Sequence, residues 1–458
     1  MSRHKKAQLI EGPVPQLLLK MTLPMMLGMV GMVAFNLADT YFVGQLGTKE
    51  LAAMSFTFPV IMIISSLALG LGMGTSAVVS RAIGEGDQQK VQRLTTDSLM
   101  LSLALVAVFV VIGFLTITPL FRFLGATPEI LPFIKQYMVL WYPGMIAVVI
   151  PMVGNNAIRA TGDTKTPSLI MLVAVFVNII LDPLLIFGMG PFPRLGIAGA
   201  ALATIFSRAI TVTVALWILS RREKMLTFVR PSLTVLLASW KRILYIGLPA
   251  AATNMLLPIS AGIIMKFIAT YGAEAVAGFG VATRIEMFVM ITVYSLSSVL
   301  GPFIGQNWGA KKYDRVMQGI TSSQQFSIAW GLAMFMILAV VGKSVASVFN
   351  ADPLVVSTAA AYFGIVPIGY GAQGVLRLST TAFSVLNKPL SSSLLIIVQA
   401  FVLYVPFAYL GFRVFGLQGI FSAAAGSYII AALMAYFWLK GYVSADHQRH
   451  LSQQIETI

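Results

Sequence analysis

The sequence contains no cysteine and only three histidines. Without cysteine the chain has no disulfide, no thiolate nucleophile and no cysteine-ligated zinc. The histidines are His4, His447 and His450, all near the termini, so we expect no histidine metal site inside the chain. The sequence also lacks a GxxxxGK[ST] nucleotide loop, which argues against an ATP site.

Charged residues are scarce as well. Asp, Glu, Lys and Arg make up 10% of the 458 residues, whereas hydrophobic residues make up 58%, against about 25% and 45–50% in soluble domains. The mean hydropathy is +0.86. This composition excludes a water-soluble enzyme, a disordered chain and a nucleic-acid-binding module. It indicates an all-α polytopic membrane protein, since the apolar runs are long and lack the alternation of a β-barrel.

The apolar runs predict twelve transmembrane helices, because about 20 apolar residues cross a bilayer. The predicted spans are 18–45, 54–79, 95–119, 133–156, 167–189, 197–219, 243–269, 279–303, 319–341, 357–378, 391–411 and 417–439.

Basic residues test this map. With twelve spans, 22 of the 31 Lys and Arg residues fall on the side of the termini and 5 fall on the opposite side. Because cytoplasmic loops are enriched in Lys and Arg, both termini are predicted to be cytoplasmic. We therefore attribute the net charge of +15 to membrane topology and not to nucleic-acid binding, and expect a multi-pass protein of a bacterial or archaeal plasma (inner) membrane.

The two halves of the chain resemble each other. A shift of 225 residues superimposes Pro24 on Pro249 and Gly47 on Gly272, and a later shift of 220 superimposes Gly196 on Gly416. Six spans per half give both halves one orientation, which predicts two pseudo-symmetric six-helix bundles. The expected domains are an N-terminal lobe (1–219), a cytoplasmic linker with an interfacial amphipathic helix (220–242) and a C-terminal lobe with a cytoplasmic tail (243–458).

Two acidic residues lie inside predicted spans of the first half. Asp39 follows Asn36 by three residues, and Asp182 follows Asn178 by four, so each acid shares a helix face with an amide. An intramembrane carboxylate costs about 2.5–3.5 kcal/mol to insert and usually marks a functional site. The matching positions of the second half are Ile264 and Val405. The asymmetry predicts that one lobe is specialised for proton or cation coupling.

Two carboxylates in one low-dielectric pocket should titrate as a coupled pair. They could carry a proton, or hold sodium together with amide oxygens; a structural hydrogen-bond cluster is the alternative. Pro24 lies in the same span as Asp39 and is expected to bend it.

Other charges have weaker interpretations. Glu286 is expected to neutralise Lys266 or to bind a cation, and Asp97 to be a solvated charge at a helix start. Arg159 and Asp163 are expected to form a cytoplasmic loop cluster.

The sequence resembles the multidrug and toxic compound extrusion (MATE) family, and within it the DinF-like branch. The resemblance rests on NLADTYFVGQLG with Asp39, RATGDTKTP, NIILDPLLIFG with Asn178 and Asp182, and LGIAGAALAT with Thr204. It implies two six-helix bundles in a V shape and drug export by proton or sodium antiport. The NorM-like branch has acids on its seventh and tenth helices, where this chain has none.

The resemblance also implies the roles of individual residues. Asp39 would be the coupling residue, with Asn178, Asp182, Thr204 and, on the fourth span, Asn155 around it. Sodium, if bound, would lie at Asp39, Asn178, Asp182 and Thr204.

The expected protein is therefore no enzyme and needs no cofactor beyond the coupling ion. Its expected partners are amphipathic cationic drugs and the lipid bilayer, and it is expected to be a monomer. The alternatives are a flippase for lipid-linked oligosaccharides and an intramembrane aspartyl protease using Asp39 and Asp182. A flippase should have a basic cavity, and the protease usually has YD and GxGD motifs, which differ from the AD and LD found here.

Overall fold

The computed structural model describes residues 8–455, and the surroundings of side chains up to residue 444. Every regular element in this range is helical. The contacts divide the chain into two units, one with Leu23–Ala251 and one with Ala7–Thr22 and Ala252–Ile458. Helix α1 (Val14–Gly44) passes from the second unit to the first next to Pro24, and α7 (Leu233–Ala269) passes back near its middle.

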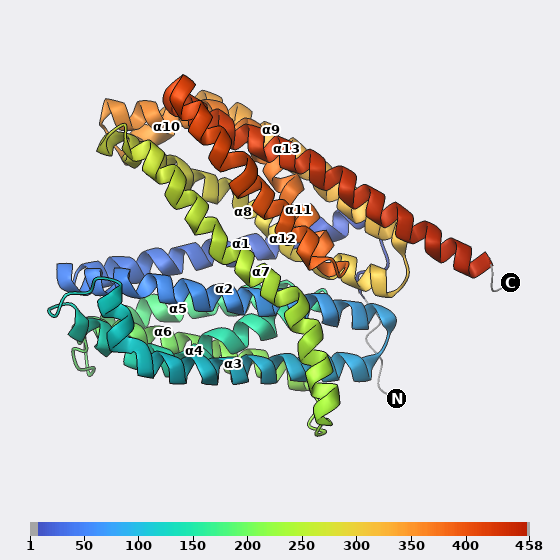
Figure 1. Ribbon diagram of the computed structural model, residues 1–458. Helices are drawn as coiled ribbons and strands as arrows, with labels where there is room; N and C mark the ends of the chain where they lie inside the picture. The colour runs from blue at the N-terminus through green and yellow to red at the C-terminus, as the bar shows by residue number, and fades with distance from the viewer. Residues whose placement is uncertain (1–7, 456–458) are drawn as a thin grey trace. The chain divides into compact units, whose positions relative to one another are not determined.

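The first unit holds five further helices that pack side by side (Figure 1). They are α2 (Thr48–Glu85), α3 (Gln88–Phe123), α4 (Leu131–Ala160), α5 (Lys165–Phe187) and α6 (Ile197–Trp217), which continues as the short π-helix η1 (Ile218–Arg222). Helix α4 is the centre of this bundle, since it packs against α2, α3 and α6.

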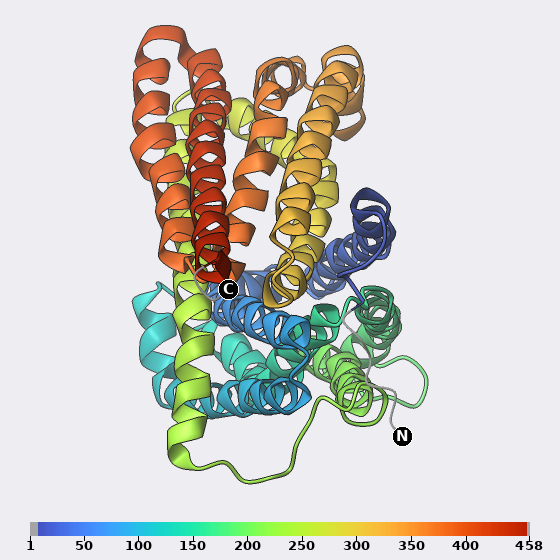
Figure 2. The ribbon, with the colours of Figure 1, turned by 90° about the vertical axis from the view of Figure 1, so that its right-hand side faces the viewer.

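The second unit repeats this plan, and Figure 2 shows its long helices running alongside one another. Its elements are α8 (Ala273–Gly309), α9 (Tyr313–Phe349), α10 (Pro353–Ile365), the 3₁₀ turn η2 (Val366–Gly369), α11 (Tyr370–Val385), α12 (Pro389–Ile397), the π-helix η3 (Val398–Tyr404) and α13 (Val405–Ile455).

Twelve spans follow from these helices. Eleven continuous helical stretches of the described chain are long and apolar enough to cross a membrane, and the last, Pro389–Ser444, has 56 residues. Gly416 breaks that stretch with a non-helical backbone. This stretch therefore holds two spans, one before Gly416 and one after it. All twelve predicted spans coincide with helices.

The amphipathic helix predicted in the linker is continuous with the following span. Residues 223–232 are not helical, and Leu233–Arg242 form the first turns of α7 and not a separate interfacial helix. The apolar spacing in this segment is real, but it continues without a breaker into the seventh span. The indole of Trp240 donates a hydrogen bond to the carbonyl of Asp97 (3.0 Å), which anchors this part of α7 on α3.

The backbone itself carries the internal repeat. Residues with positive φ recur at the same spacing in both halves: 225 residues separate Gly47 from Gly272, Gly86 from Lys311 and Gly162 from Asn387, and 220 separate Gly196 from Gly416. The last pair is nearly identical in conformation, with φ 58°, ψ −134° at Gly196 and φ 63°, ψ −139° at Gly416. The matched glycines of the sequence therefore mark matched turns before the last helix of each half.

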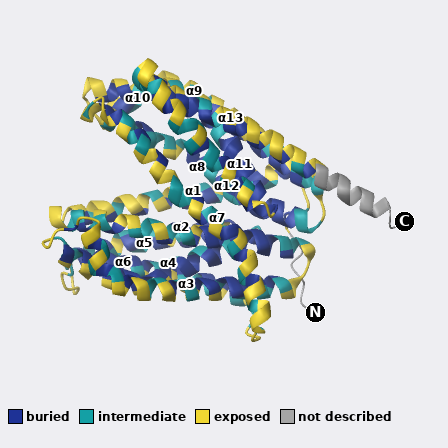
Figure 3. Cartoon of the chain, in the orientation of Figure 1, coloured by how far each residue is buried: buried dark blue, intermediate teal, exposed yellow. Residues whose placement is uncertain are grey.

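Buried residues gather between the helices of each unit, and exposed residues lie on their outer faces (Figure 3). Many of the exposed residues are large and apolar. Large buried side chains include Phe121 and Tyr142 in the first unit and Phe363 and Phe421 in the second. An apolar exterior around a packed interior is the arrangement that a bilayer requires.

We predict that Gly416→Ala destabilises the protein by about 1–3 kcal/mol, because only glycine adopts this backbone region without strain. Thermal unfolding of the purified protein in detergent would show the loss as a lower melting temperature. The control is Gly426→Ala, a helical position where a Cβ would meet nothing within 4 Å. Equal melting temperatures for the two variants would contradict the prediction.

Candidate functional site

Asp39 and Asp182 lie in the interior of the first unit. Asp39 of α1 is 7% exposed, and Asp182 and Asn178 of α5 are fully buried. The Asn178 side-chain amide donates a hydrogen bond to Oδ1 of Asp182 over 3.2 Å, as their four-residue spacing predicts. Asn36, by contrast, is exposed, so the amide next to Asp39 in the sequence does not share its surroundings.

The two acids are close enough to interact electrostatically, and both act on the buried Tyr137 of α4. Three helices thus bring polar groups together. Oδ1 of Asp39, Oδ2 of Asp182 and Oδ1 of Asn178 are buried without a hydrogen-bond partner. Buried carboxylates without donors are costly, and a proton or a small cation would satisfy these oxygens.

Glycines set the distance between α1 and α5. A Cβ on Gly31 would lie 2.7 Å from Leu172, and one on Gly28 would lie 3.2 Å from Ser168. Only small residues let two helices approach this closely. The close packing directs Asp39, two turns beyond Gly31, towards the interior of the bundle.

Thr204 and Asn155 lie on neighbouring helices of the same unit. Thr204 is on α6 and is 8% exposed; Asn155 is on α4 and is 7% exposed, with its Oδ1 buried and without a partner. No hydrogen bond joins either side chain to the acids in the described chain. The structure thus joins Asn178 to Asp182 and brings Asp39 within electrostatic range of Asp182. Thr204 and Asn155 lie on helices that pack against α5.

The oxygens of Asp39, Asp182 and Asn178 are ligands of the type that sodium prefers. No group of three or more His, Cys, Asp or Glu residues occurs in the part of the chain that the structure describes. His4 lies outside the described residues, and the side chains of His447 and His450 are not described.

The loop between α4 and α5 corrects one expectation. Arg159 and Asp163 do not pair: Arg159 contacts the sulfur of Met25, whereas Asp163 forms an ion pair with Arg222. Asp163 also accepts hydrogen bonds from the backbone and hydroxyl of Thr166. Burial raises the pKa of Asp163, but the bonds from Thr166 and Arg222 outweigh it and hold the pKa below its usual range.

The structure corrects the expected partners of two further charged residues. Asp97 is fully buried and pairs with Arg93 one turn earlier, because the loop before α7 covers this end of α3. Glu286 pairs not with Lys266 but with the Tyr362 hydroxyl and with the Gln373 amide (3.2 Å). Glu286 therefore belongs to a hydrogen-bonded cluster of the second unit.

The second unit lacks the polar pair of the first. Ile264, the counterpart of Asp39, is buried in an apolar cluster, and Val405, the counterpart of Asp182, directly follows the π-helix η3. The segment that carries Asn178 and Asp182 in the first unit is thus apolar and locally rewound in the second.

Nothing in the sequence distinguishes Tyr137 from other aromatic residues of apolar spans. Arg208 of α6 is recognisable from the sequence, because it is a charged residue inside a span. Its guanidinium lies 4.8 Å from the centre of the Phe35 ring on α1.

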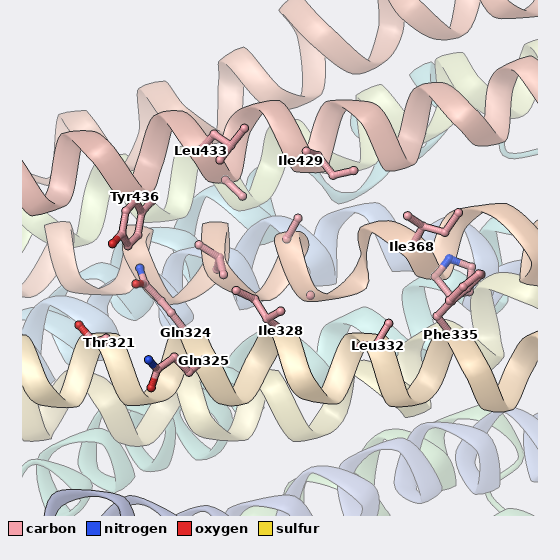
Figure 4. A pocket seen from close by; sticks show the side chains of 15 residues that line it. Thr321, Gln324, Gln325, Ile328, Leu332, Phe335, Ile368, Ile429, Leu433 and Tyr436 are labelled. Carbon is pink, nitrogen blue, oxygen red and sulfur yellow. The ribbon is translucent and has the colours of Figure 1, made fainter.

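A groove of about 630 Å³ lies in the second unit between α9, α11 and α13. Its lining has no charged residue; Thr321, Gln324 and Gln325 lie at one end, and Leu332, Phe335 and Ile368 at the other (Figure 4). The groove has no carboxylate that could carry a coupling ion, and it is distinct from the acidic site of the first unit.

The MatE family profile matches this sequence twice, over residues 24–184 and 249–410. The chain belongs to the MatE family. The two matches begin at Pro24 and Pro249, the pair that opens the internal repeat, and the twelve-helix, two-lobe fold is that of the family. Because family members are transporters, the chain is a transporter of the membrane and not an enzyme; the DinF-like branch stays a prediction.

Its relatives include transporters of different substrates. A FAD transporter of Shewanella oneidensis is 38% identical over 94% of this chain and 95% of its own. The multidrug export protein MepA of Staphylococcus haemolyticus is 26% identical over 93% of each chain. The crystal structure of the MATE transporter VcmN of Vibrio cholerae in the bent form superimposes with a TM-score of 0.90, at 29% identity over 95% of this chain and 98% of that one.

We predict that Asp163→Asn lowers stability by roughly 1–3 kcal/mol at pH 7, because it weakens charge-assisted hydrogen bonds. A carboxyl whose folded pKa is depressed stabilises the fold above its unfolded pKa of about 3.9 and ceases to do so as the pH falls through the folded value. The difference from wild type should therefore vanish in acid. The control is Glu129→Gln, which removes an exposed ion pair with Lys49 and should leave stability close to that of wild type, because solvent screens such pairs. A deficit of Asp163→Asn that persists below pH 3 would contradict this.

Proposed function

We propose that this transporter exports small aromatic compounds by antiport against protons or sodium, with Asp39 as the coupling residue. The observation that carries the proposal is the pair of buried carboxylates with unpartnered oxygens, Asp39 and Asp182, in the first unit. Asn178, Thr204 and Asn155 complete the polar surroundings of the pair. We further propose that both termini are cytoplasmic and that the transporter works as a monomer in the plasma membrane.

The proposed mechanism follows from the electrostatics of the pair. Two adjacent carboxylates in low dielectric disfavour full ionisation, so binding of one proton or one sodium relieves both desolvation and mutual repulsion. Binding and release of the ion therefore change the electrostatic force between α1, which carries Asp39, and α5, which carries Asp182. Helix α1 contains Pro24, which removes one backbone hydrogen bond and makes a bend cheaper there. We propose that ion binding bends α1 and so expels the substrate.

The substrate has two candidates. Amphipathic organic cations follow from the multidrug relatives, to which the chain is similar at 25–28% identity. FAD is favoured by a specific observation: the relative that is a FAD transporter shares 38% identity over nearly the whole chain.

Asp39→Asn should abolish ion-coupled transport, because an amide cannot exchange a proton and carries no charge for sodium. In everted vesicles, wild type should release protons or sodium when a transported compound is added, and Asp39→Asn should release neither. The matched control is Glu286→Gln, which removes the charge of an intramembrane acid of the second unit and keeps one acceptor oxygen for its two donors, Tyr362 and Gln373.

The same vesicles identify the ion. Release that persists without sodium and follows a pH gradient indicates protons, whereas release that requires sodium indicates sodium. If Asp39→Asn behaved like wild type, or if Glu286→Gln lost coupling in its place, the assignment to the first unit would be refuted.

A further inference from the structure

Arg208 is a half-buried cation without a counter-ion among the described residues. It lies near the middle of α6, on the inward stripe that also holds Thr204 and Thr211. Its Nε is buried and has no hydrogen-bond partner. Within the described residues it forms no ion pair with an acidic side chain. An unpaired guanidinium at membrane depth is costly and points to a ligand that supplies the missing negative charge.

Its neighbour is an aromatic ring. The guanidinium carbon lies 4.8 Å from the centre of Phe35, which is 6% exposed. Cation–π contact of this kind orients a guanidinium but leaves its N–H groups available in the plane of the fork. The N–H geometry matches a phosphate or carboxylate. Phe35 adds an apolar surface beside the cation.

This pair adjoins the acidic site. Phe35 lies four residues before Asp39 on α1, and Arg208 lies four residues after Thr204 on α6. Each step is one helical turn, about 6 Å of rise. Because both steps stay on one helix face, a molecule held at Arg208 and Phe35 would reach towards Asp39 within the first unit.

We propose that Arg208 and Phe35 form a binding site for a planar aromatic compound that carries phosphate, such as a nucleotide. The phosphate binds the guanidinium, and Phe35 packs against apolar parts of the ligand. This inference rests on the export function proposed above and specifies its substrate class. A simple organic cation is disfavoured at this position, because the guanidinium of Arg208 repels it.

The flavins provide matched probes, since riboflavin, FMN and FAD share one ring and carry none, one and two phosphates. The experiment measures their affinities for the purified full-length transporter in detergent by flavin fluorescence. Wild type should bind FMN at least about tenfold more tightly than riboflavin, as expected for a charge-assisted bidentate contact. Arg208→Gln should reduce that ratio to about one while leaving riboflavin affinity within twofold.

Three variants separate recognition from folding. Arg208→Lys keeps the charge and should retain part of the preference for FMN. Phe35→Leu should weaken FMN and riboflavin by the same factor, because the ring contacts what the two share. Arg284→Gln removes an exposed arginine of α8 in the second unit and should behave like wild type. Melting temperatures of all variants show whether each is folded.

Several outcomes would overturn the site: equal affinity of wild type for FMN and riboflavin, an unchanged ratio in Arg208→Gln, or tighter binding of a cationic dye such as rhodamine 6G than of FMN. In these cases ion release from vesicles can still occur and depend on Asp39, so the export proposal survives. Conversely, phosphate-dependent binding without any ion-coupled transport would refute the export proposal and leave the site intact.

Discussion

The burial of two carboxylates with too few hydrogen-bond donors is the constraint on which the first unit is organised. Asn178 supplies one donor to Asp182, and oxygens of both acids remain without a partner. In a low dielectric, such a pair is stable only when something positive is added. The surrounding fold makes this addition local: α1 packs on α5 through Gly28 and Gly31, so a change of charge at Asp39 acts on the contact between these two helices. A site that was equally stable with and without its ion could not drive a conformational change.

The pair of buried acids occurs in only one of the two repeated halves. Both halves share their turns, down to the near-identical backbone at Gly196 and Gly416, so the repeat preserves the scaffold. Scaffold positions tolerate replacement where the backbone permits it, as Lys311 and Asn387 stand where the first half has glycine. The acids are absent from the second half, where Ile264 and an apolar segment around η3 stand in their place. The two halves therefore share their backbone turns but not their acidic residues. This difference is expected if only the first unit binds the coupling ion.

The sequence predicted the fold nearly in full, because each span is a long apolar run and each turn carries glycine or a charge. It also identified Asp39, Asn178 and Asp182, since an intramembrane acid is rare enough to stand out and helical spacing finds its amide partner. It failed where contacts depend on tertiary packing. Nothing in the sequence shows that Tyr137 faces both acids, that Asp163 pairs with Arg222, or that Glu286 bonds to Tyr362 and Gln373. The helical start of α7 was misplaced because amphipathic spacing cannot distinguish a separate interfacial helix from the first turns of a longer one.

Arg208 changes how ion and substrate can exclude each other. For a cationic substrate, competition is electrostatic, because a proton on Asp39 removes the charge that attracts the substrate. For a phosphate-bearing substrate at Arg208, protonation of Asp39 removes a repulsive charge one turn away and so favours binding. Antiport of such a substrate then requires that the ion act through shape and not through charge. Helix α1 carries both Phe35 and Asp39, with Pro24 nearer its start, so a bend of α1 would withdraw the Phe35 ring from Arg208 when the ion binds. On this reasoning, the preference for phosphate and the antagonism with the ion are separable properties of one helix.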